Sequence, residues 1–184
     1  MSRPMTTKRL GVFSLLACLT AACGEGRAIL NIDLLSFFPS AALDTAYTVP
    51  GGTSLPLTVN PVEVTTVELG GSVIDSAFVT VAADVQNTTG SGTVEFEVYF
   101  DRQVLTLFAP GNLVAADTAA VSGPGTVTLA PPPFLVGDPT VLASDKFWVG
   151  VRLVGNASAG PAMTGRVQVG VLSLRMVVQD ELTP

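Results

Sequence analysis

Two acidic side chains, Glu95 and Glu97, have a spacing that could support acid–base chemistry. They alternate with Val94, Phe96 and Val98, so we expect both on one face of a strand, about 6–7 Å apart from the strand rise. Glycosidases use two carboxyl groups at a comparable separation, one of them as the proton donor. The simpler interpretation is a solvated strand face whose charges keep the strand soluble. A glycosidase-type enzyme using these two residues is therefore the least favoured of three functions.

The sequence contains no histidine. This excludes histidine-based acid–base catalysis, Ser–His and Cys–His nucleophile pairs, and imidazole metal sites. The sequence also has no glycine-rich phosphate loop that opens a helix and no regular calcium-binding loop. We therefore expect a protein that is not an enzyme and that uses neither a metal nor a cofactor.

One group of side chains could form a binding surface. Lys146, Trp148 and Arg152 are expected on one face of a strand, opposite Phe147. A tryptophan between two cations could stack on a sugar ring or contact a protein partner. The alternative is a structural role, in which Trp148 covers Gly150 or packs beneath a loop.

The N-terminus carries a targeting pattern. Basic residues at Arg3, Lys8 and Arg9 precede an apolar run from Leu10 to Ala22. A basic start, a short apolar run and a small-residue end are typical of an export signal. The run has about 13 residues, against the roughly 20 that a membrane-spanning helix needs. We therefore expect a signal peptide over residues 1–22 and not a permanent transmembrane anchor.

The residues at the end of this run, Leu19 to Gly24 (Leu-Thr-Ala-Ala-Cys-Gly), resemble the lipobox of bacterial lipoproteins. The resemblance implies cleavage before Cys23, attachment of acyl chains such as palmitate to this residue, and anchoring in a membrane. Cys18 fits a similar pattern, but its use would shorten the apolar run. The alternative is an ordinary signal peptide with an unmodified cysteine. Gly24 resembles the signal for outer-membrane sorting, which predicts a lipid-anchored protein of the cell envelope, in the outer membrane if the source has two membranes.

Charge limits the partners of the exported chain. After removal of residues 1–22 the chain keeps all fifteen acidic residues and six scattered basic ones. This balance excludes nucleic acid as a partner, because such binding needs clustered lysine and arginine. It also argues against electrostatic docking on anionic lipid headgroups, so membrane attachment would depend on the lipid at Cys23.

The rest of the chain alternates apolar and polar residues in short runs, the pattern of antiparallel strands with one solvated face. After a short tether at residues 23–27, we predict one all-β domain over residues 28–184. The predicted fold is an antiparallel two-sheet sandwich, Ig-like or jelly-roll-like, with about eight or nine strands and at most one or two short helices. The clear strand candidates are residues 28–34, 79–85, 94–100 and 147–153, and the weaker ones are 55–59, 62–69, 103–108, 126–130 and 166–179.

Three local expectations accompany this fold. Residues 79–100 look like a hairpin with a loop near Gly90. Asn112 could cap a short helix over residues 113–120. The C-terminal strand changes its apolar phase near Val171, which indicates a bulge where the strand passes to the other sheet, or else a strand covered on both faces.

The function favoured by these observations is a membrane-anchored exported lipoprotein that acts as a non-enzymatic binding, structural or assembly module of the cell envelope. Its partners would be the membrane, through the lipid on Cys23, and an unidentified envelope protein. The alternative is a small-ligand or glycan-binding β-sandwich that uses the Trp148 face.

Overall fold

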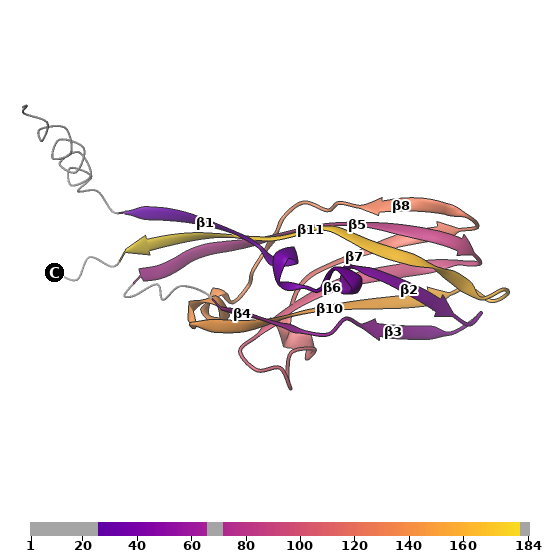
Figure 1. Ribbon diagram of the computed structural model, residues 1–184, viewed down its shortest axis with the longest axis horizontal. Helices are drawn as coiled ribbons and strands as arrows, with labels where there is room; N and C mark the ends of the chain where they lie inside the picture. Colours follow the sequence, from indigo (N-terminus) through magenta and orange to yellow (C-terminus); the bar gives the residue numbers. More distant parts are fainter. Residues whose placement is uncertain (1–25, 66–71, 181–184) are drawn as a thin grey trace, which may run out of the picture.

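The two sheets of the protein pack face to face as an antiparallel β-sandwich (Figure 1). This computed structural model describes residues 26–65 and 72–180. The predicted all-β sandwich is confirmed. The expected signal peptide and Cys23 lie outside the described residues, as does the end of the strand expected over residues 62–69.

Eleven strands are present in the described residues, somewhat more than the eight or nine expected. Sheet A has the order β1 (Arg27–Asp33), β11 (Met163–Asp180), β5 (Ser72–Thr89) and β8 (Gly125–Leu129), with β2 (Asp44–Val49) also paired to β11 and β9 (Phe134–Leu135) to β5. Sheet B has the order β3 (Ser54–Thr58), β10 (Lys146–Ala157), β6 (Ser91–Asp101) and β7 (Leu113–Ser122), with β4 (Val62–Thr65) also paired to β10.

Short 3-10 turns, and no α-helix, interrupt the strands within the described ranges. They are η2 (Leu34–Phe37), η3 (Ser40–Leu43), η4 (Pro110–Asn112) and η5 (Pro139–Ala143). No helix in this part of the chain has the length and hydropathy needed to span a bilayer.

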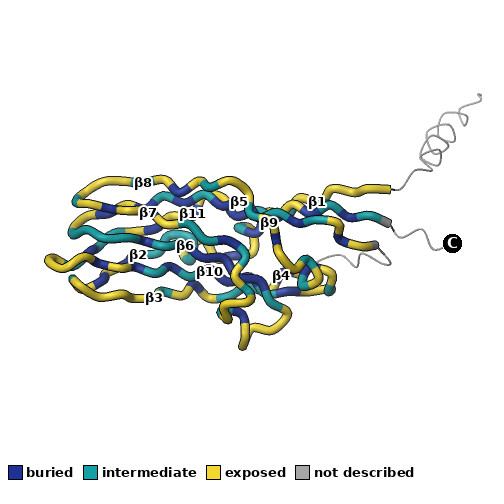
Figure 2. Tube along the Cα trace, turned by 180° about the vertical axis from the view of Figure 1, so that it is seen from behind, coloured by how far each residue is buried: buried dark blue, intermediate teal, exposed yellow. Residues whose placement is uncertain are grey.

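The core lies between the two sheets, where every second side chain of the long strands is buried (Figure 2). Val94, Phe96 and Val98 of β6 and Phe147 of β10 are at most 2% exposed, as the sequence predicts. Because these side chains point inward, the alternate residues of β6 and β10 form the outer face of sheet B.

The predicted hairpin over residues 79–100 is wrong. β5 belongs to sheet A and β6 to sheet B, so the chain crosses from one sheet to the other at Gly90. Gly90 has a φ of 74°, and a Cβ there would lie 2.6 Å from the carbonyl oxygen of Ala162. Glycine is needed at this corner because any side chain would meet both a strained backbone and a steric clash.

Asn87, a buried amide, stabilises the corner. Its Nδ2 donates hydrogen bonds to the carbonyl oxygens of Gly90, at 3.1 Å, and Gly123, at 2.8 Å. Its Oδ1 accepts a hydrogen bond from the Tyr47 hydroxyl at 3.0 Å. One buried side chain thus joins the end of β5, the crossing between the sheets and the turn between β7 and β8. Burial raises the pKa of Tyr47.

The helix expected over residues 113–120 is also wrong, because this segment is strand β7. Its alanines have a high helix propensity, but pairing with β6 and burial of Ala115, Ala119 and Val121 stabilise the strand instead. Residues 103–108, a weak strand candidate, form a turn-rich loop.

The bulge predicted in the C-terminal strand is present. The register of β11 against β5 shifts between Val169 and Val171, and Gly170 lies between them. Val169 and Leu172 therefore both face the core although they are three residues apart. The strand does not pass to the other sheet, since β11 pairs within sheet A along its whole length.

The contribution of the core can be tested with Phe96→Ala. We expect the free energy of unfolding in urea to fall by about 3–5 kcal/mol, because the variant leaves a cavity between the sheets. The control is Leu105→Ala, at a side chain that is 94% exposed, where we expect a change of less than about 0.5 kcal/mol. Equal losses for the two variants would contradict the assigned core.

Candidate functional site

Strand β10 places Lys146, Trp148 and Arg152 on the outer face of sheet B. Phe147 and Val149, which alternate with them, are fully buried in the core. Lys146 is exposed, whereas Trp148 and Arg152 are half-buried. The three side chains therefore share a face, and their value as a binding surface depends on what else covers that face.

A loop at residues 102–112, between β6 and β7, covers part of this outer face. Leu107 in the loop is fully buried, and the ring of Phe108 meets the ring of Tyr99 edge-on at 5.3 Å between centroids. A Cβ on Gly150 would lie 2.8 Å from side-chain atoms of both Leu107 and Phe108. Gly150 is therefore covered by this loop, which forms a second, smaller apolar cluster outside the sandwich core.

Arg152 is engaged within the same cluster. Its Nε donates a hydrogen bond to Oε2 of Glu97 at 2.5 Å, and its Nη2 donates one to the hydroxyl of Tyr99. The guanidinium carbon lies 4.9 Å from the centroid of the Tyr99 ring. The hydrogen bond to Glu97 raises the pKa of Arg152, while burial, followed by the charge of Glu97, raises the pKa of Tyr99. Arg152 thus stabilises the fold around Glu97 and Tyr99.

Glu95 and Glu97 do share a face of β6, as the spacing predicts. The expectation of a solvated face is wrong for Glu97, which is only 7% exposed and is paired with Arg152. Glu95 is half-buried on the same strand. The carboxylate of Glu97 is buried and bonded to the guanidinium of Arg152, so it has a structural role. A carboxylate in such an ion pair is poorly placed to exchange a proton with a substrate.

Lys146 also has a partner on its neighbouring strand. Its Nζ lies 3.3 Å from Oε2 of Glu63 on β4, and both side chains are exposed. An exposed pair of this kind contributes little to stability, about 0–1 kcal/mol. The two cations beside Trp148 are therefore both paired with carboxylates and do not form an unneutralised positive surface.

The structure adds a cleft that the sequence did not single out. It has a volume of about 470 Å³ and lies between the loop after β6 and the segment around η5. Trp148 does not line it. Its polar lining residues are Asp101, Arg102, Asn112, Asp138 and Thr140. Only tertiary structure brings these residues together, since they come from two segments that are separated by strands β7 to β9.

Hydrogen bonds within the lining engage most of these polar groups. Oδ2 of Asp101 accepts from the hydroxyl of Thr106 at 2.5 Å and from Nδ2 of Asn112 at 2.8 Å. Arg102 donates to the carbonyl oxygen of Thr140, which joins the two segments that line the cleft. Hydrogen bonds from Thr140 lower the pKa of Asp138. No group of three or more histidine, cysteine, aspartate or glutamate side chains in residues 26–65 and 72–180 is arranged to hold a metal ion.

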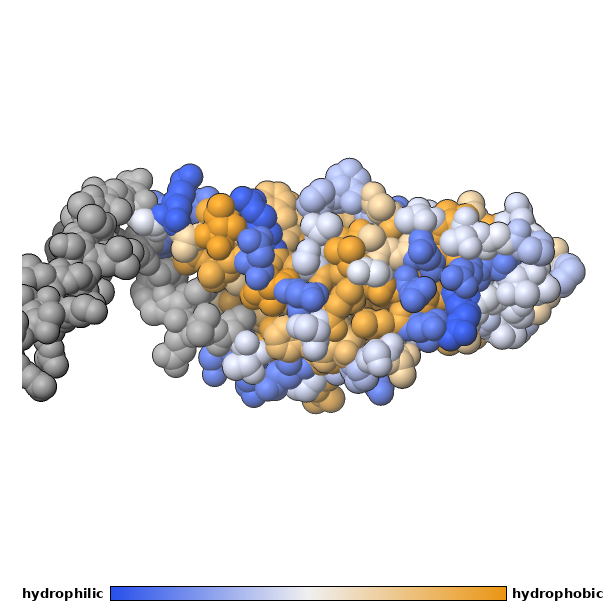
Figure 3. All heavy atoms as spheres, turned by 45° about the horizontal axis from the view of Figure 1, so that its top comes forward, coloured by the Kyte–Doolittle hydropathy of each residue, from blue (hydrophilic) through white to orange (hydrophobic). Residues whose placement is uncertain are grey.

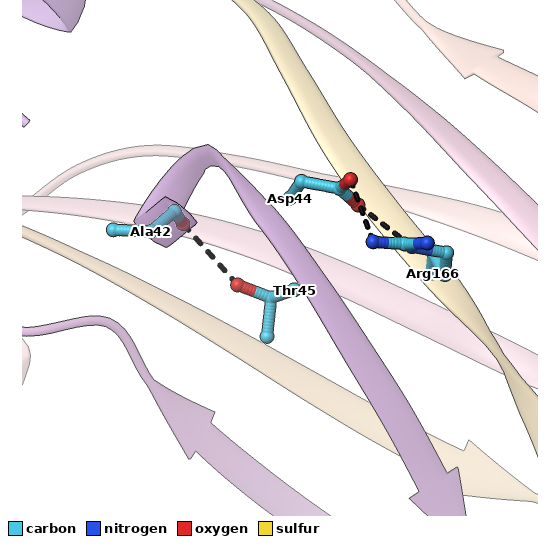
Figure 4. Close-up of polar contacts among 4 residues, drawn as sticks. All are labelled: Ala42, Asp44, Thr45 and Arg166. Atoms are coloured by element: carbon cyan, nitrogen blue, oxygen red, sulfur yellow. Dashed lines mark hydrogen bonds and ion pairs between the residues drawn. The ribbon is translucent and has the colours of Figure 1, made fainter. Parts of the chain in front are cut away.

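On the outer face of sheet A, Asp44 and Arg166 form a bidentate ion pair between β2 and β11, with N···O distances of 2.9 and 2.7 Å (Figure 4). The hydroxyl of Thr45 donates to the carbonyl oxygen of Ala42 at 3.2 Å at the start of the same strand. These contacts fix the entry of β2 into the sheet and leave no unpaired charge among the residues drawn.

Comparison with known proteins supplies no family for this chain. No family model matches the sequence, and no curated protein matches it. Among solved structures, T=1 particles derived from infectious bursal disease virus match with a TM-score of 0.47 and 12% identity over 85% of this chain and 36% of theirs. The Gx strain of infectious bursal disease virus matches with a TM-score of 0.45 and 11% identity over 86% of this chain and 33% of its own. The chain thus spans about a third of the length of these structures.

The role of Arg152 can be tested with Arg152→Ala. We expect a loss of about 2–4 kcal/mol in the free energy of unfolding, because Glu97 would remain buried without its cation. The matched control is Arg166→Ala, which removes an exposed bidentate pair and should cost less than about 1 kcal/mol. Urea unfolding of both variants checks the difference, and similar losses would show that the Arg152–Glu97 pair is no more than a surface contact.

Proposed function

We propose that this chain is an exported lipoprotein, anchored in a membrane by acyl chains on Cys23, that acts through non-enzymatic contacts in the cell envelope. The observation that carries the proposal is the export signal followed by the Leu19-to-Gly24 pattern. The start of β1 at Arg27 supports it, because a regular fold begins four residues after the proposed first residue of the mature chain. A tether of this length reaches about 15 Å when fully extended.

The state of the polar side chains supports a role without catalysis. The sequence lacks histidine, and Glu97, the more buried of the two spaced acids, is held by Arg152. Every buried side-chain nitrogen and oxygen in the described residues has a hydrogen-bond partner. These groups are satisfied by the fold itself, which favours a protein that works through its surface.

The anchor can be tested with Cys23→Ser. Buried acyl chains contribute about 0.8 kcal/mol per methylene, and two or more chains hold a protein stably to a bilayer. We therefore expect the variant either to leave the membrane fraction or to retain its uncut signal peptide, which fractionation and intact-mass measurement distinguish. Recovery of a cleaved chain of normal size in the membrane fraction would overturn the proposal. Cys18→Ser is the control and should still be anchored.

The Trp148 face, proposed as the contact with a protein partner or alternatively with a glycan, can be tested with Trp148→Ala. If Trp148 makes such a contact, crosslinking to envelope proteins in the native membrane, or the rise in melting temperature with added glycans, should disappear while stability in urea is kept. Trp148→Phe is the control for loss of aromatic area. A stability loss of several kcal/mol, or no change in any of these measurements, would remove this residue from the proposed contact site.

A further inference from the structure

The outer face of sheet A carries exposed apolar side chains at the end of the molecule at which β1 begins. There, β1 and the neighbouring parts of β11 and β5 run side by side (Figure 1). Ile29 of β1 is 54% exposed and lies directly opposite Val177 of β11, which is half-buried. Val73 of β5 is 47% exposed on the same face. Single apolar side chains are common on protein surfaces, but a group of them on one face indicates a contact surface.

The group continues along the same face toward the middle of the molecule. Phe78 of β5 pairs in register with Leu135 of β9, which is 61% exposed. Val171, beside the bulge of β11, is 40% exposed and lies opposite Ala82. We call the set Ile29, Val73, Phe78, Leu135, Val171 and Val177 the anchor-side patch.

The other half of this face is polar. It carries the Asp44–Arg166 pair and the carboxylate of Asp84, which accepts a hydrogen bond from the hydroxyl of Thr128 at 2.6 Å. Figure 3 shows apolar residues gathered in the middle of the molecule, a smaller apolar group flanked by hydrophilic residues toward the end at which β1 begins, and a hydrophilic band nearer the other end. The exposed apolar side chains therefore lie mainly away from this band, with exposed polar residues such as Asn31 and Asp33 of β1 beside them.

We infer that the anchor-side patch rests on the lipid surface of the membrane in which Cys23 is anchored. The inference rests on the lipoprotein function proposed above. A tether of about 15 Å keeps the start of β1 next to the bilayer, so the lipid is present beside the patch at a high effective concentration. A second copy or another protein would have to reach the patch by diffusion along the membrane, whereas lipid is always beside it.

Charge on the same face is consistent with a lipid surface without net charge. Arg27 and Arg175 alternate with the apolar residues on this face, Asp33 lies on the same face at the end of β1, and all three are exposed. Long cationic side chains can extend to the phosphate level of the headgroups while their stems cover apolar surface. Apolar groups of an interfacial protein reach about 5–10 Å into the headgroup and acyl boundary, a depth that surface side chains of a sheet can occupy.

Site-directed labelling tests the contact on the full lipidated chain in phosphatidylcholine vesicles. No cysteine lies in residues 26–184, and acylation blocks the sulfur of Cys23, so Ile29→Cys and Leu135→Cys can each carry one environment-sensitive fluorophore. We expect emission to shift to shorter wavelengths and to be quenched by acyl chains that carry bromine. The matched controls are Thr128→Cys on the polar half of the face and Leu105→Cys on the loop that covers sheet B, and neither should respond.

The outcomes separate the inference from the anchor. If the chain sediments with vesicles but the labels at positions 29 and 135 stay in water, the inference is overturned and the anchor stands. A chain that does not sediment overturns both. A blue shift without quenching by the brominated lipid would show that a second copy or another protein covers the patch, and would also overturn the inference.

Combining Ile29→Asp with Leu135→Asp should abolish the response of a label at Val171→Cys, whereas Leu105→Asp should leave it unchanged.

Discussion

The antiparallel ladder between β5 and β11 is the framework on which the other strands of sheet A assemble. Each strand has 18 residues, and their pairing runs from one end of sheet A to the other. The far edge of β11 receives β1 and β2, and the far edge of β5 receives β8 and β9. A ladder of this length must keep its apolar side chains on one face. The bulge at Gly170 permits this in β11, because it adds one residue to the alternation and thereby turns both Val169 and Leu172 toward the core.

The crossing at Gly90 then decides how the second sheet lies on the first. Because the chain leaves sheet A there and enters sheet B at once, β6 begins where β5 ends, and both strands contribute their inward side chains to the same core. The hydrogen bonds of Asn87 hold this corner to the turn at Gly123. The direction of β6 also fixes what faces outward, so that Glu97 and Tyr99 point away from the core, where Arg152 and the loop at residues 102–112 cover them.

The two outer faces consequently have different characters. On sheet B, Lys146 is paired with Glu63 and Arg152 with Glu97, and Gly150 lies beneath Leu107 and Phe108. On sheet A, several exposed apolar side chains, among them Ile29, Val73 and Leu135, lie among polar ones in the middle and toward the start of β1, while a hydrophilic band lies nearer the other end (Figure 3). The face singled out from the sequence by its tryptophan is therefore the more self-contained one, while the face that the sequence left unmarked exposes the larger group of apolar side chains.

The all-β class, the two-sheet arrangement and the main core residues can be predicted from the sequence, because a period of two in hydrophobicity shows which side of a strand is buried. The sequence also indicated the bulge near Val171. An extra residue in one strand moves the following apolar residues by one position, so that they still point to the buried face.

The sequence could not show which strands pair when they are far apart in the chain. The alternation in residues 79–100 is the same whether β5 and β6 pair with each other or lie in opposite sheets, and the alanines of β7 favour a helix until β6 is beside them. The pairing of Glu97 with Arg152, 55 positions apart, and the grouping of Ile29, Val177 and Leu135 on one face arise only when strands distant in the chain come into register. Local pattern encodes which face of a strand is apolar, and only tertiary pairing decides what that face meets.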